Sequence, residues 1–299
     1  MPTSDPFRPF FLTGATGTGK TALAIALSQD FPIEIVNADA FQLYRGLTTL
    51  TASPSEAELA ICPHHLYGVL DPAESCDAGR YLTLARPVLE AIIQRSHIPV
   101  VTGGSGLYLK ALTHGLDDLL PVNPSIREDL NRLTLDEVRE RLGALDPVSL
   151  NRIEPLNRRY LQRALEISLT ANQPASQLRK SWTSDPPGLR GVLLERPREQ
   201  LFNRIEQRAI AMLDGGALEE VAAIESWSPT SLQAIGVREI QSHLRGEIDR
   251  DTCIQRIQMI TRRYAKRQIT WFRREHWLQR MEIPPGEDWK SQIAGKILL

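Results

Sequence analysis

The chain has 299 residues, 42% of them hydrophobic, with a formal net charge of −1 at pH 7, a composition typical of a soluble globular protein with a substantial core. A charge so close to zero means that any nucleic acid must be bound by a local basic patch. No stretch approaches ~20 apolar residues, and Met1 to Pro9 lacks the apolar core of a signal peptide, so we expect no membrane role. The three cysteines are scattered, which argues against a zinc site or a disulfide framework and favours a cytoplasmic location.

The first predicted elements enclose a phosphate loop. An apolar run at residues 10–12 predicts a strand, residues 22–27 predict a helix, and between them stands Gly14-Ala15-Thr16-Gly17-Thr18-Gly19-Lys20-Thr21. Glycines let successive N–H groups turn inward, Lys20 adds a charge, and the helix presents its positive end to an anion. Thr21 would offer a hydroxyl to Mg²⁺. An ordinary glycine-rich turn is the alternative, but the match at every fixed position favours a polyphosphate site.

A second predicted strand, residues 33–39, ends in Asp39. Ligands of open α/β sheets bind at the carboxyl ends of strands, so we expect Asp39 to share a crevice with the phosphate loop, unless it only caps a turn. Residues 41–70 predict a long functional loop with short elements. We interpret His64 and His65 there as structural hydrogen-bonding groups rather than a metal or acid–base pair, because adjacent side chains point to different faces.

The next segment predicts a helix and a third strand. Asp77 is predicted to cap a helix whose apolar face runs to Ile93, and residues 98–102 predict a strand that leads into Gly103-Gly104-Ser105-Gly106. That turn ends another strand, so Ser105 is expected to point into the same crevice. A simple tight turn is the alternative.

From residue 121 the chain changes character. Arginines punctuate helical stretches bounded by proline and asparagine, which predicts a helical insertion with a basic surface, although interspersed acids also suit an ordinary solvated face. Residues 191–194 return to strand character. The predicted fold is therefore α/β, a P-loop NTPase-like parallel sheet core formed by residues 1–120 and 190–299, with a mostly helical insertion at 121–189.

Two helices near the C-terminus carry conspicuous arginines. In the helix predicted at 199–213, Arg204 and Arg208 lie one turn apart, where they could bind phosphate oxygens or form a surface salt-bridge row with Glu206. Between Arg256 and Arg274, basic residues form two neighbouring rows on one helix face, which is a suitable footprint for a nucleic-acid backbone. We expect the nearby Trp271 and Phe272 to belong to the core rather than to stack on bases.

These features leave several chemistries open. A phosphate loop most often belongs to an ATP- or GTP-dependent enzyme, but the strand at 98–102 ends in Thr-Gly-Gly-Ser where hydrolases have an acid, and Glu195 is an imperfect substitute. A motor ATPase is thus disfavoured, whereas a small-molecule kinase with Asp39 as base remains. The competing hypothesis is that the loop holds a diphosphate leaving group while a nucleic-acid base is the nucleophile. A non-catalytic RNA-binding regulator is the third possibility.

Motifs along the chain then favour the second hypothesis. They are the phosphate loop, Asp39-Ala40-Phe41-Gln42-Leu43-Tyr44-Arg45-Gly46, Pro63-His64-His65-Leu66, Gly103-Gly104-Ser105-Gly106-Leu107-Tyr108, Gln233-Ala234-Ile235-Gly236, and the run from Thr261 to Arg273. In content and order they closely resemble the tRNA dimethylallyltransferase family. The resemblance implies a monomeric, Mg²⁺-dependent enzyme that transfers a dimethylallyl group from dimethylallyl diphosphate to N6 of the adenosine 3′ to the anticodon.

The resemblance also implies roles for individual residues. Asp39 would be the general base on N6, Ser105 would stand beside the reacting centre, and Arg208 would clamp the diphosphate held by Gly14 to Thr21, with Thr21 also on Mg²⁺. The stretches matched to tRNA contacts are Asp39, Ala40, Phe41 and Gln42; Ser105; Arg127; Arg159, Tyr160, Leu161, Gln162 and Arg163; and Gln233, Ala234, Ile235, Gly236, Val237, Arg238, Glu239 and Ile240.

The chain departs from the family pattern in three places. Leu47 to Pro54 lacks the acid and the lysine of the usual Asp-Ile-Gly-Thr-Ala-Lys-Pro, Val237 replaces a tyrosine, and Arg159-Tyr160 replaces a Gln-Arg pair.

Overall fold

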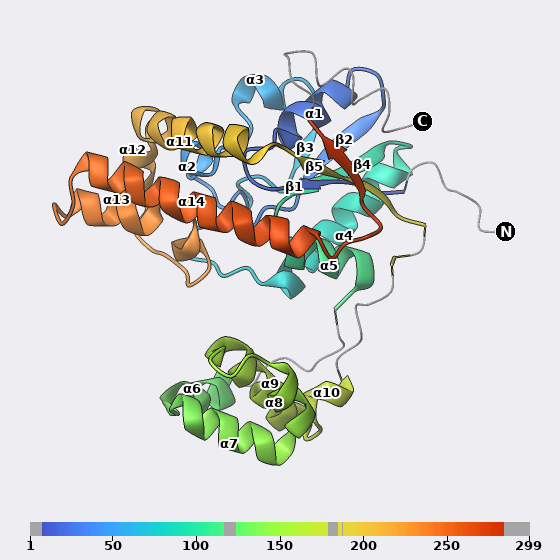
Figure 1. Ribbon diagram of the computed structural model, residues 1–299. Helices are drawn as coiled ribbons and strands as arrows, with labels where there is room; N and C mark the ends of the chain where they lie inside the picture. The colour runs from blue at the N-terminus through green and yellow to red at the C-terminus, as the bar shows by residue number, and fades with distance from the viewer. Residues whose placement is uncertain (1–7, 117–123, 179–184, 187, 284–299) are drawn as a thin grey trace. The chain divides into compact units, whose positions relative to one another are not determined.

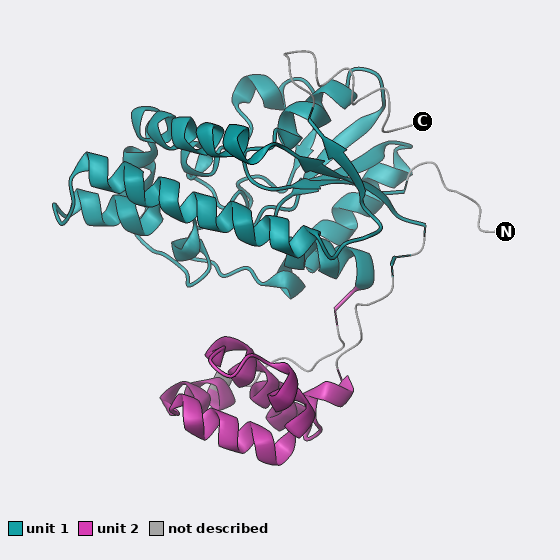
Figure 2. Cartoon of the chain, in the orientation of Figure 1, with its two compact units in different colours: residues 1–114, 185–299 teal, residues 115–184 magenta. Residues whose placement is uncertain are grey.

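The computed structural model describes residues 8–116, 124–178, 185–186 and 188–283. The chain forms two compact units, residues 1–114 together with 185–299, and residues 115–184 (Figure 2). The first unit is thus discontinuous in sequence. The predicted start of the insertion, at Leu120 and Pro121, lies outside the described residues, and its predicted end at residue 189 falls five residues into the first unit.

The first unit is built on a six-stranded, all-parallel sheet with the order β3-β2-β4-β1-β5-β6, which confirms the predicted α/β class. The strands are β1 (Phe10–Gly14), β2 (Ile33–Asn37), β3 (His64–His65), β4 (Ile98–Gly103), β5 (Arg190–Glu195) and β6 (Gln279–Glu282). The four inner strands are those that the sequence predicts. The two edge strands, β3 and β6, are short and were not predicted.

Strand register decides where the phosphate loop emerges. Thr13 lies opposite Gly103 on β4, and Gly14 lies opposite Leu194 on β5. The loop therefore leaves the sheet between the carboxyl ends of two neighbouring strands, as ligand-binding loops of this class do. Each of the four inner strands is apolar and buried along most of its length, as expected for a sheet covered on both faces.

Helices cover the two faces of the sheet, with α1 on one side and α4 and α5 on the other (Figure 1). Asp77 caps α4 as predicted, because its carboxylate accepts the N–H of Arg80. Helices α11 and α13 both pack against the long α14. The helices of this unit are α1 (Lys20–Leu27), α2 (Thr48–Thr51), α3 (Glu56–Leu59), α4 (Ala78–Gln94), α5 (Gly106–His114), α11 (Arg198–Asp214), α12 (Ala217–Ala222), α13 (Val237–Leu244) and α14 (Arg250–Phe272), with a 3₁₀ turn at Ser231–Gln233.

The second unit is helical, as predicted. It comprises α6 (Pro124–Arg132), α7 (Leu135–Leu145), α8 (Pro147–Arg152), α9 (Arg158–Ala171) and α10 (Ala175–Leu178). Its own apolar core includes Leu130, Val138, Leu142, Leu161 and Leu165. Throughout the described ranges of both units, no helix combines the length and apolar character needed to cross a bilayer.

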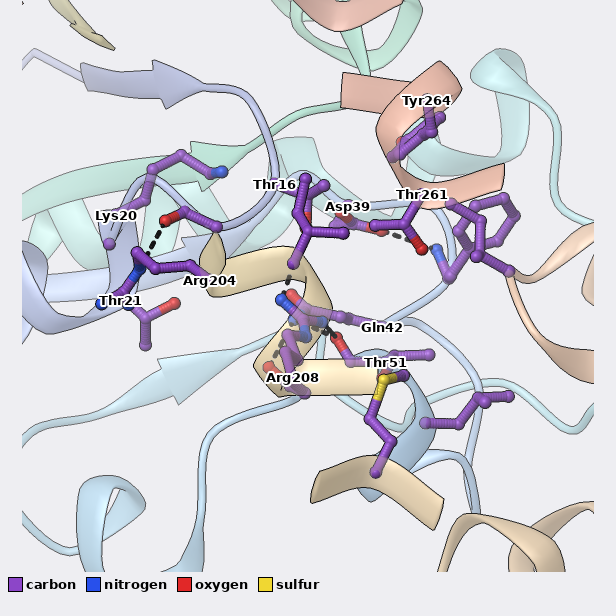
Figure 3. A pocket seen from close by; sticks show the side chains of 18 of the residues that line it. Thr16, Lys20, Thr21, Asp39, Gln42, Thr51, Arg204, Arg208, Thr261 and Tyr264 are labelled. Atoms are coloured by element: carbon purple, nitrogen blue, oxygen red, sulfur yellow. Dashed lines mark hydrogen bonds between the residues drawn. The ribbon is translucent and has the colours of Figure 1, made fainter. Parts of the chain in front are cut away.

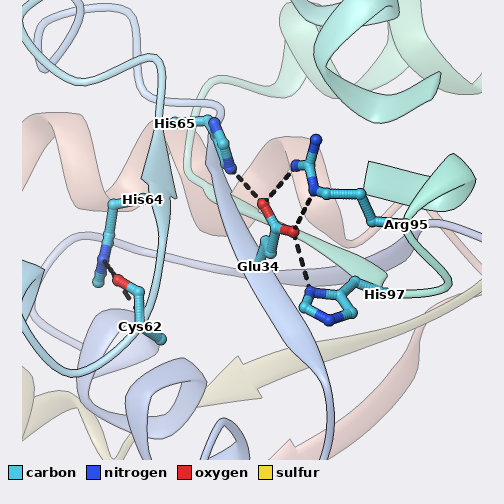
Figure 4. Close-up of polar contacts among 6 residues, drawn as sticks. All are labelled: Glu34, Cys62, His64, His65, Arg95 and His97. Carbon is cyan, nitrogen blue, oxygen red and sulfur yellow. Dashed lines mark hydrogen bonds and ion pairs between the residues drawn. The ribbon is translucent and has the colours of Figure 1, made fainter. Parts of the chain in front are cut away.

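A buried carboxylate ties β2 to β3 and to the segment that precedes β4. Glu34 on β2 accepts hydrogen bonds from Arg95 Nε and Nη2 at 3.0 and 2.8 Å, and lies 2.6 Å from His65 Nε2 and 2.9 Å from His97 Nδ1 (Figure 4). Burial by itself would raise the pKa of Glu34, but the hydrogen bonds and charges of Arg95 and His65 outweigh it and lower the pKa to about 2.

The two adjacent histidines are structural, as predicted. His65 belongs to the Glu34 cluster, and His64 Nδ1 lies 2.8 Å from the carbonyl oxygen of Cys62 (Figure 4). No group of three or more potential metal-ligating side chains is found in the part of the chain that the structure describes.

Candidate active site

The phosphate loop, Asp39 and the arginines of α11 line one cavity of about 250 Å³ in the first unit (Figure 3). It opens at the carboxyl ends of the strands. Apolar side chains, including those of Leu50, Met212 and Ile235, line it alongside the polar groups. The site thus combines an anion-binding end with apolar walls, which suits a substrate that is charged at one end only.

The phosphate loop adopts backbone conformations that need glycine. Gly14 has φ 150° and would place a Cβ 2.6 Å from the carbonyl oxygen of Leu194, and Gly17 has φ 83°. Lys20 Nζ donates to the carbonyl oxygens of Gly14 and Ala15, both at 3.0 Å. Because α1 begins at Lys20, its free N–H groups also face the loop.

Burial sets the charge state of Lys20. Desolvation lowers the pKa of Lys20 to about 8, with Asp39 acting to raise it and Arg208 to lower it. The lysine is therefore mostly protonated at neutral pH and carries a positive charge in a partly desolvated place. An anion entering the cavity would restore the favourable interactions that burial removes.

Asp39 both caps a turn and lines the cavity, so the two roles considered from the sequence coexist. Its N–H donates to Asn37 Oδ1 at 2.8 Å, and its own Oδ1 accepts the N–H of Phe41 at 3.0 Å. These bonds fix the orientation of the carboxylate while leaving it in the cavity wall. A carboxylate held in this way is preorganised to accept a proton from a bound group.

Ser105 forms the contacts of a turn beside the cavity. Its Oγ accepts the N–H of Ala40 at 2.9 Å, and its own N–H donates to the carbonyl of Ala38 at 3.2 Å. A Cβ at Gly103 would lie 2.2 Å from that carbonyl. Ser105 therefore joins the ends of β2 and β4 and positions the segment that follows Asp39. The expected role of Ser105 beside the reacting centre stays a prediction.

Gln268 connects the phosphate loop to the same turn, a role that the sequence did not reveal. Its side chain on α14 is buried; Oε1 accepts the N–H of Thr16 at 2.8 Å, and Nε2 donates to the carbonyl of Gly104 at 3.0 Å. A glutamine four residues after Tyr264, on the apolar side of the predicted helix, was the available signal, since a buried amide must find partners.

The two arginines of α11 point to the loop. Arg208 donates to Thr16 Oγ1 at 3.3 Å and to the Thr51 carbonyl at 2.8 Å, while Arg204 Nε donates to the Gly17 carbonyl at 2.9 Å (Figure 3). Burial lowers the pKa of the Arg208 guanidinium, Asp39 opposes this and Arg204 adds to it. The alternative salt-bridge row is not formed, because Glu206 pairs with Arg262.

The stretches predicted to contact tRNA are only partly accessible. The side chains of Leu161, Ala234, Val237 and Ile240 are buried, so these four pack in the core and position their neighbours. The expectation that the stretches contact tRNA stays a prediction. Ile235 lines the cavity together with Phe41 and Gln42. Arg159, Gln233 and Arg238 are exposed, as is Tyr160 at 53%.

Two arginines of the second unit share one acid. Arg127 Nε and Arg163 Nη1 donate to the two oxygens of the buried Glu166, at 2.7 and 2.6 Å. Their side chains remain 57% and 40% exposed. The pair therefore forms a fixed basic feature on the surface of that unit.

The basic face predicted near the C-terminus lies on α14. Its exposed members are Arg256, Arg263, Lys266 and Arg267, and Arg273 and Arg274 follow the helix. Arg267 lies over the ring of Tyr264, 5.6 Å from its centroid. Phe272 is buried, as predicted, and a Cβ at Gly106 would lie 2.2 Å from the indole nitrogen of Trp271, which shows that this indole also packs closely.

Comparisons with known proteins agree on one family. The model of the "IPP transferase" family matches residues 42–275, and that of the "Isopentenyl transferase" family matches residues 8–65. A tRNA dimethylallyltransferase of Akkermansia muciniphila is 39% identical over 96% of this chain and 97% of its own length, and one of Phenylobacterium zucineum is 42% identical over 89% of each.

Solved structures show the same likeness. The tRNA isopentenylpyrophosphate transferase of Bacillus halodurans superimposes with a TM-score of 0.70 at 28% identity, covering 97% of this chain and 95% of its own. A eukaryotic dimethylallyltransferase described as acting on tRNA gives a TM-score of 0.78 at 26% identity, covering 92% and 73%.

Proposed function

The chain belongs to the IPP transferase family and transfers a dimethylallyl group to tRNA, and from this premise we propose how its cavity performs the transfer. The donor is dimethylallyl diphosphate, and the acceptor is the exocyclic N6 of the adenosine 3′ to the anticodon. The observation that carries this proposal is the placement of a carboxylate and an anion-binding loop in one cavity with apolar walls.

Asp39 serves as the general base. An adenine amine is a weak nucleophile because its lone pair is delocalised into the ring, so removal of its proton during attack assists the reaction, by ~10²- to 10⁴-fold for a well-placed base. Asp39 is held by Asn37 and Phe41 and faces the cavity. N6 attacks C1 of the dimethylallyl group, the C1–O bond breaks, and Asp39 receives the proton.

The phosphate loop receives the leaving diphosphate. Negative charge accumulates on the oxygen that leaves C1, and preorganised donors stabilise it in a partly desolvated site. The candidates are the loop N–H groups, Lys20 and Arg208, which all line or adjoin the cavity. No phosphoryl group is transferred, which is consistent with the lack of an acid at the end of β4.

Mg²⁺ fits this site as a partner of the substrate. The described residues offer no cluster of three acidic or histidine ligands, and Mg²⁺ is often bound through few protein oxygens together with substrate phosphates and water. The Thr21 hydroxyl in the cavity wall would be such a ligand. When bound, the ion would neutralise diphosphate charge.

Each unit, taken by itself, has candidate residues for contact with tRNA. The accessible candidates are Gln42, Gln233 and Arg238 in the first unit and Arg159, Tyr160 and the Arg127–Arg163 pair in the second. The target base must leave its stack to reach the cavity, as in other base-modifying enzymes. We propose the anticodon stem-loop as the region bound.

One variant tests the role of Asp39. Asp39→Asn keeps an oxygen for the Phe41 N–H but cannot act as a base, so transfer from labelled dimethylallyl diphosphate to unmodified tRNA should fall at least 10²-fold while pyrophosphate binding is retained. Asp30→Asn, at an exposed position after α1, is the matched control. Near-normal turnover of Asp39→Asn would remove Asp39 as base. Labelled ATP without RNA tests the kinase alternative in the same assay.

A further inference from the structure

A carboxylate outside the cavity anchors a short helix in its wall. Glu220 on α12 accepts the N–H of Thr49 through Oε1 at 2.6 Å and the N–H of Leu50 through Oε2 at 2.9 Å. Both N–H groups belong to the first turn of α2, where backbone donors have no partner within the helix. Glu220 thus satisfies them and places a negative charge at the positive end of α2.

The other end of α2 holds two residues of the site. The Thr51 carbonyl accepts Arg208 Nη2 at 2.8 Å, and Gln42 Nε2 donates to the carbonyls of Thr51 and Ala52 at 3.2 and 2.9 Å (Figure 3). Ala52 adopts φ 46°, a left-handed conformation that is unusual for alanine and turns its carbonyl toward Gln42. Both side chains are therefore held in part by a single helical turn, and Arg208 is held also by Thr16 Oγ1.

A turn of four residues needs tertiary contacts to persist, because helices this short are unstable by themselves. Leu50 supplies one contact: it is buried, and a Cβ at Gly236 would lie only 2.9 Å from its Cδ1. Glu220 supplies two polar contacts to the first turn, and Thr49 Oγ1 adds a longer one by donating to the Gly215 carbonyl at 3.4 Å. Because the Thr51 carbonyl that anchors Arg208 is uncharged, the positive charge of Arg208 stays available to an anion. An acidic partner would have neutralised that charge.

We propose that Glu220 is a positioning residue for the transfer reaction, acting through α2 to hold Arg208 and Gln42 in the cavity. This inference rests on the proposed role of Arg208 toward the donor diphosphate. Loss of the carboxylate releases the Thr49 and Leu50 N–H groups and loosens α2. Arg208 then loses the Thr51 carbonyl as a fixed acceptor and keeps only its longer bond to Thr16 Oγ1. The donor should then bind more weakly although no residue that touches it has changed.

The test compares Glu220→Gln with Glu219→Gln, an exposed glutamate beside it on α12. The glutamine oxygen can accept only one of the two N–H groups, and its NH₂ would face the other N–H, donor against donor. The value of kcat/KM for dimethylallyl diphosphate should therefore fall about tenfold, mainly through a higher KM, and pyrophosphate should bind about tenfold more weakly. The control should match the unmodified chain. If Glu220→Gln does not fold, Glu220→Asp is measured in the same way.

A double-mutant cycle separates positioning from general damage. In an Arg208→Ala background, Glu220→Gln should cause little further loss of pyrophosphate affinity, because its effect passes through Arg208. Equal losses in both backgrounds, or an unchanged KM in Glu220→Gln, would overturn the inference. If the unmodified chain transfers label to tRNA in this assay, the proposed function stands whatever the outcome for Glu220.

Discussion

Acid should destabilise the first unit through Glu34. The pKa of this buried carboxyl is about 2, against 4.5 for an ordinary glutamate, so ionised Glu34 stabilises the folded state by about 3 kcal/mol at pH values well above 4.5. A lowered folded-state pKa means that this contribution disappears as pH falls through 4.5 toward 2. Between pH 5 and pH 3, linkage gives a loss of about 2 kcal/mol from Glu34 alone.

The assay is urea unfolding followed by tryptophan fluorescence at these two pH values. Glu34→Gln keeps the shape of the side chain but cannot titrate. From pH 5 to pH 3, the unmodified chain should therefore lose about 2 kcal/mol more of its free energy of unfolding than Glu34→Gln does. Glu90→Gln, exposed on α4, should behave like the unmodified chain. Equal acid sensitivity of Glu34→Gln and the unmodified chain would refute the reasoning.

Two further predictions concern the site and its RNA surface. Gln268→Leu leaves the Thr16 N–H and the Gly104 carbonyl without their hydrogen-bond partner, so the free energy of unfolding in urea should fall by about 2–4 kcal/mol and kcat/KM at least tenfold. The control Thr270→Ala, on the exposed side of α14, should change the free energy of unfolding by less than about 0.5 kcal/mol. Equal effects of the two variants would contradict the bridging role of Gln268. Arg263→Gln and Lys266→Gln should each weaken tRNA binding and reduce the slope of log K against log salt by about 1, because each removes one contact to a phosphate. Arg245→Gln should leave the slope unchanged, because the guanidinium of Arg245 already pairs with Glu247.

The sequence predicted the centre of the molecule because local pattern and global fold agree there. Four apolar runs became the inner strands, and their carboxyl ends brought Asp39, the phosphate loop and the α11 arginines to one cavity. Glycines with fixed spacing need a particular backbone, so they were informative without any knowledge of tertiary contacts.

What the sequence missed depends on long-range partners. Strand β3 has two residues and β6 has four, and such short segments are specified by the sheet that they join rather than by their own pattern. Gln268 lies on the apolar side of its helix, but the group that it binds on Thr16 is 252 residues away. Glu220 looks like an ordinary surface residue until the N–H of Thr49, 171 residues away, is in place. The contact of Ser105 Oγ with the Ala40 N–H likewise joins segments 65 residues apart.

The discontinuous first unit also has a consequence for synthesis. Its central strand β1 is made first, but its neighbour β5 begins at Arg190, after the whole second unit. At the usual 5–20 residues per second, β5 follows β1 by roughly 10 to 35 s. During that interval one edge of β1 has no partner strand, and by its end the contiguous helical unit has every residue that it needs to fold. The ribosome therefore delivers the inserted unit complete before the sheet into which it is inserted can close.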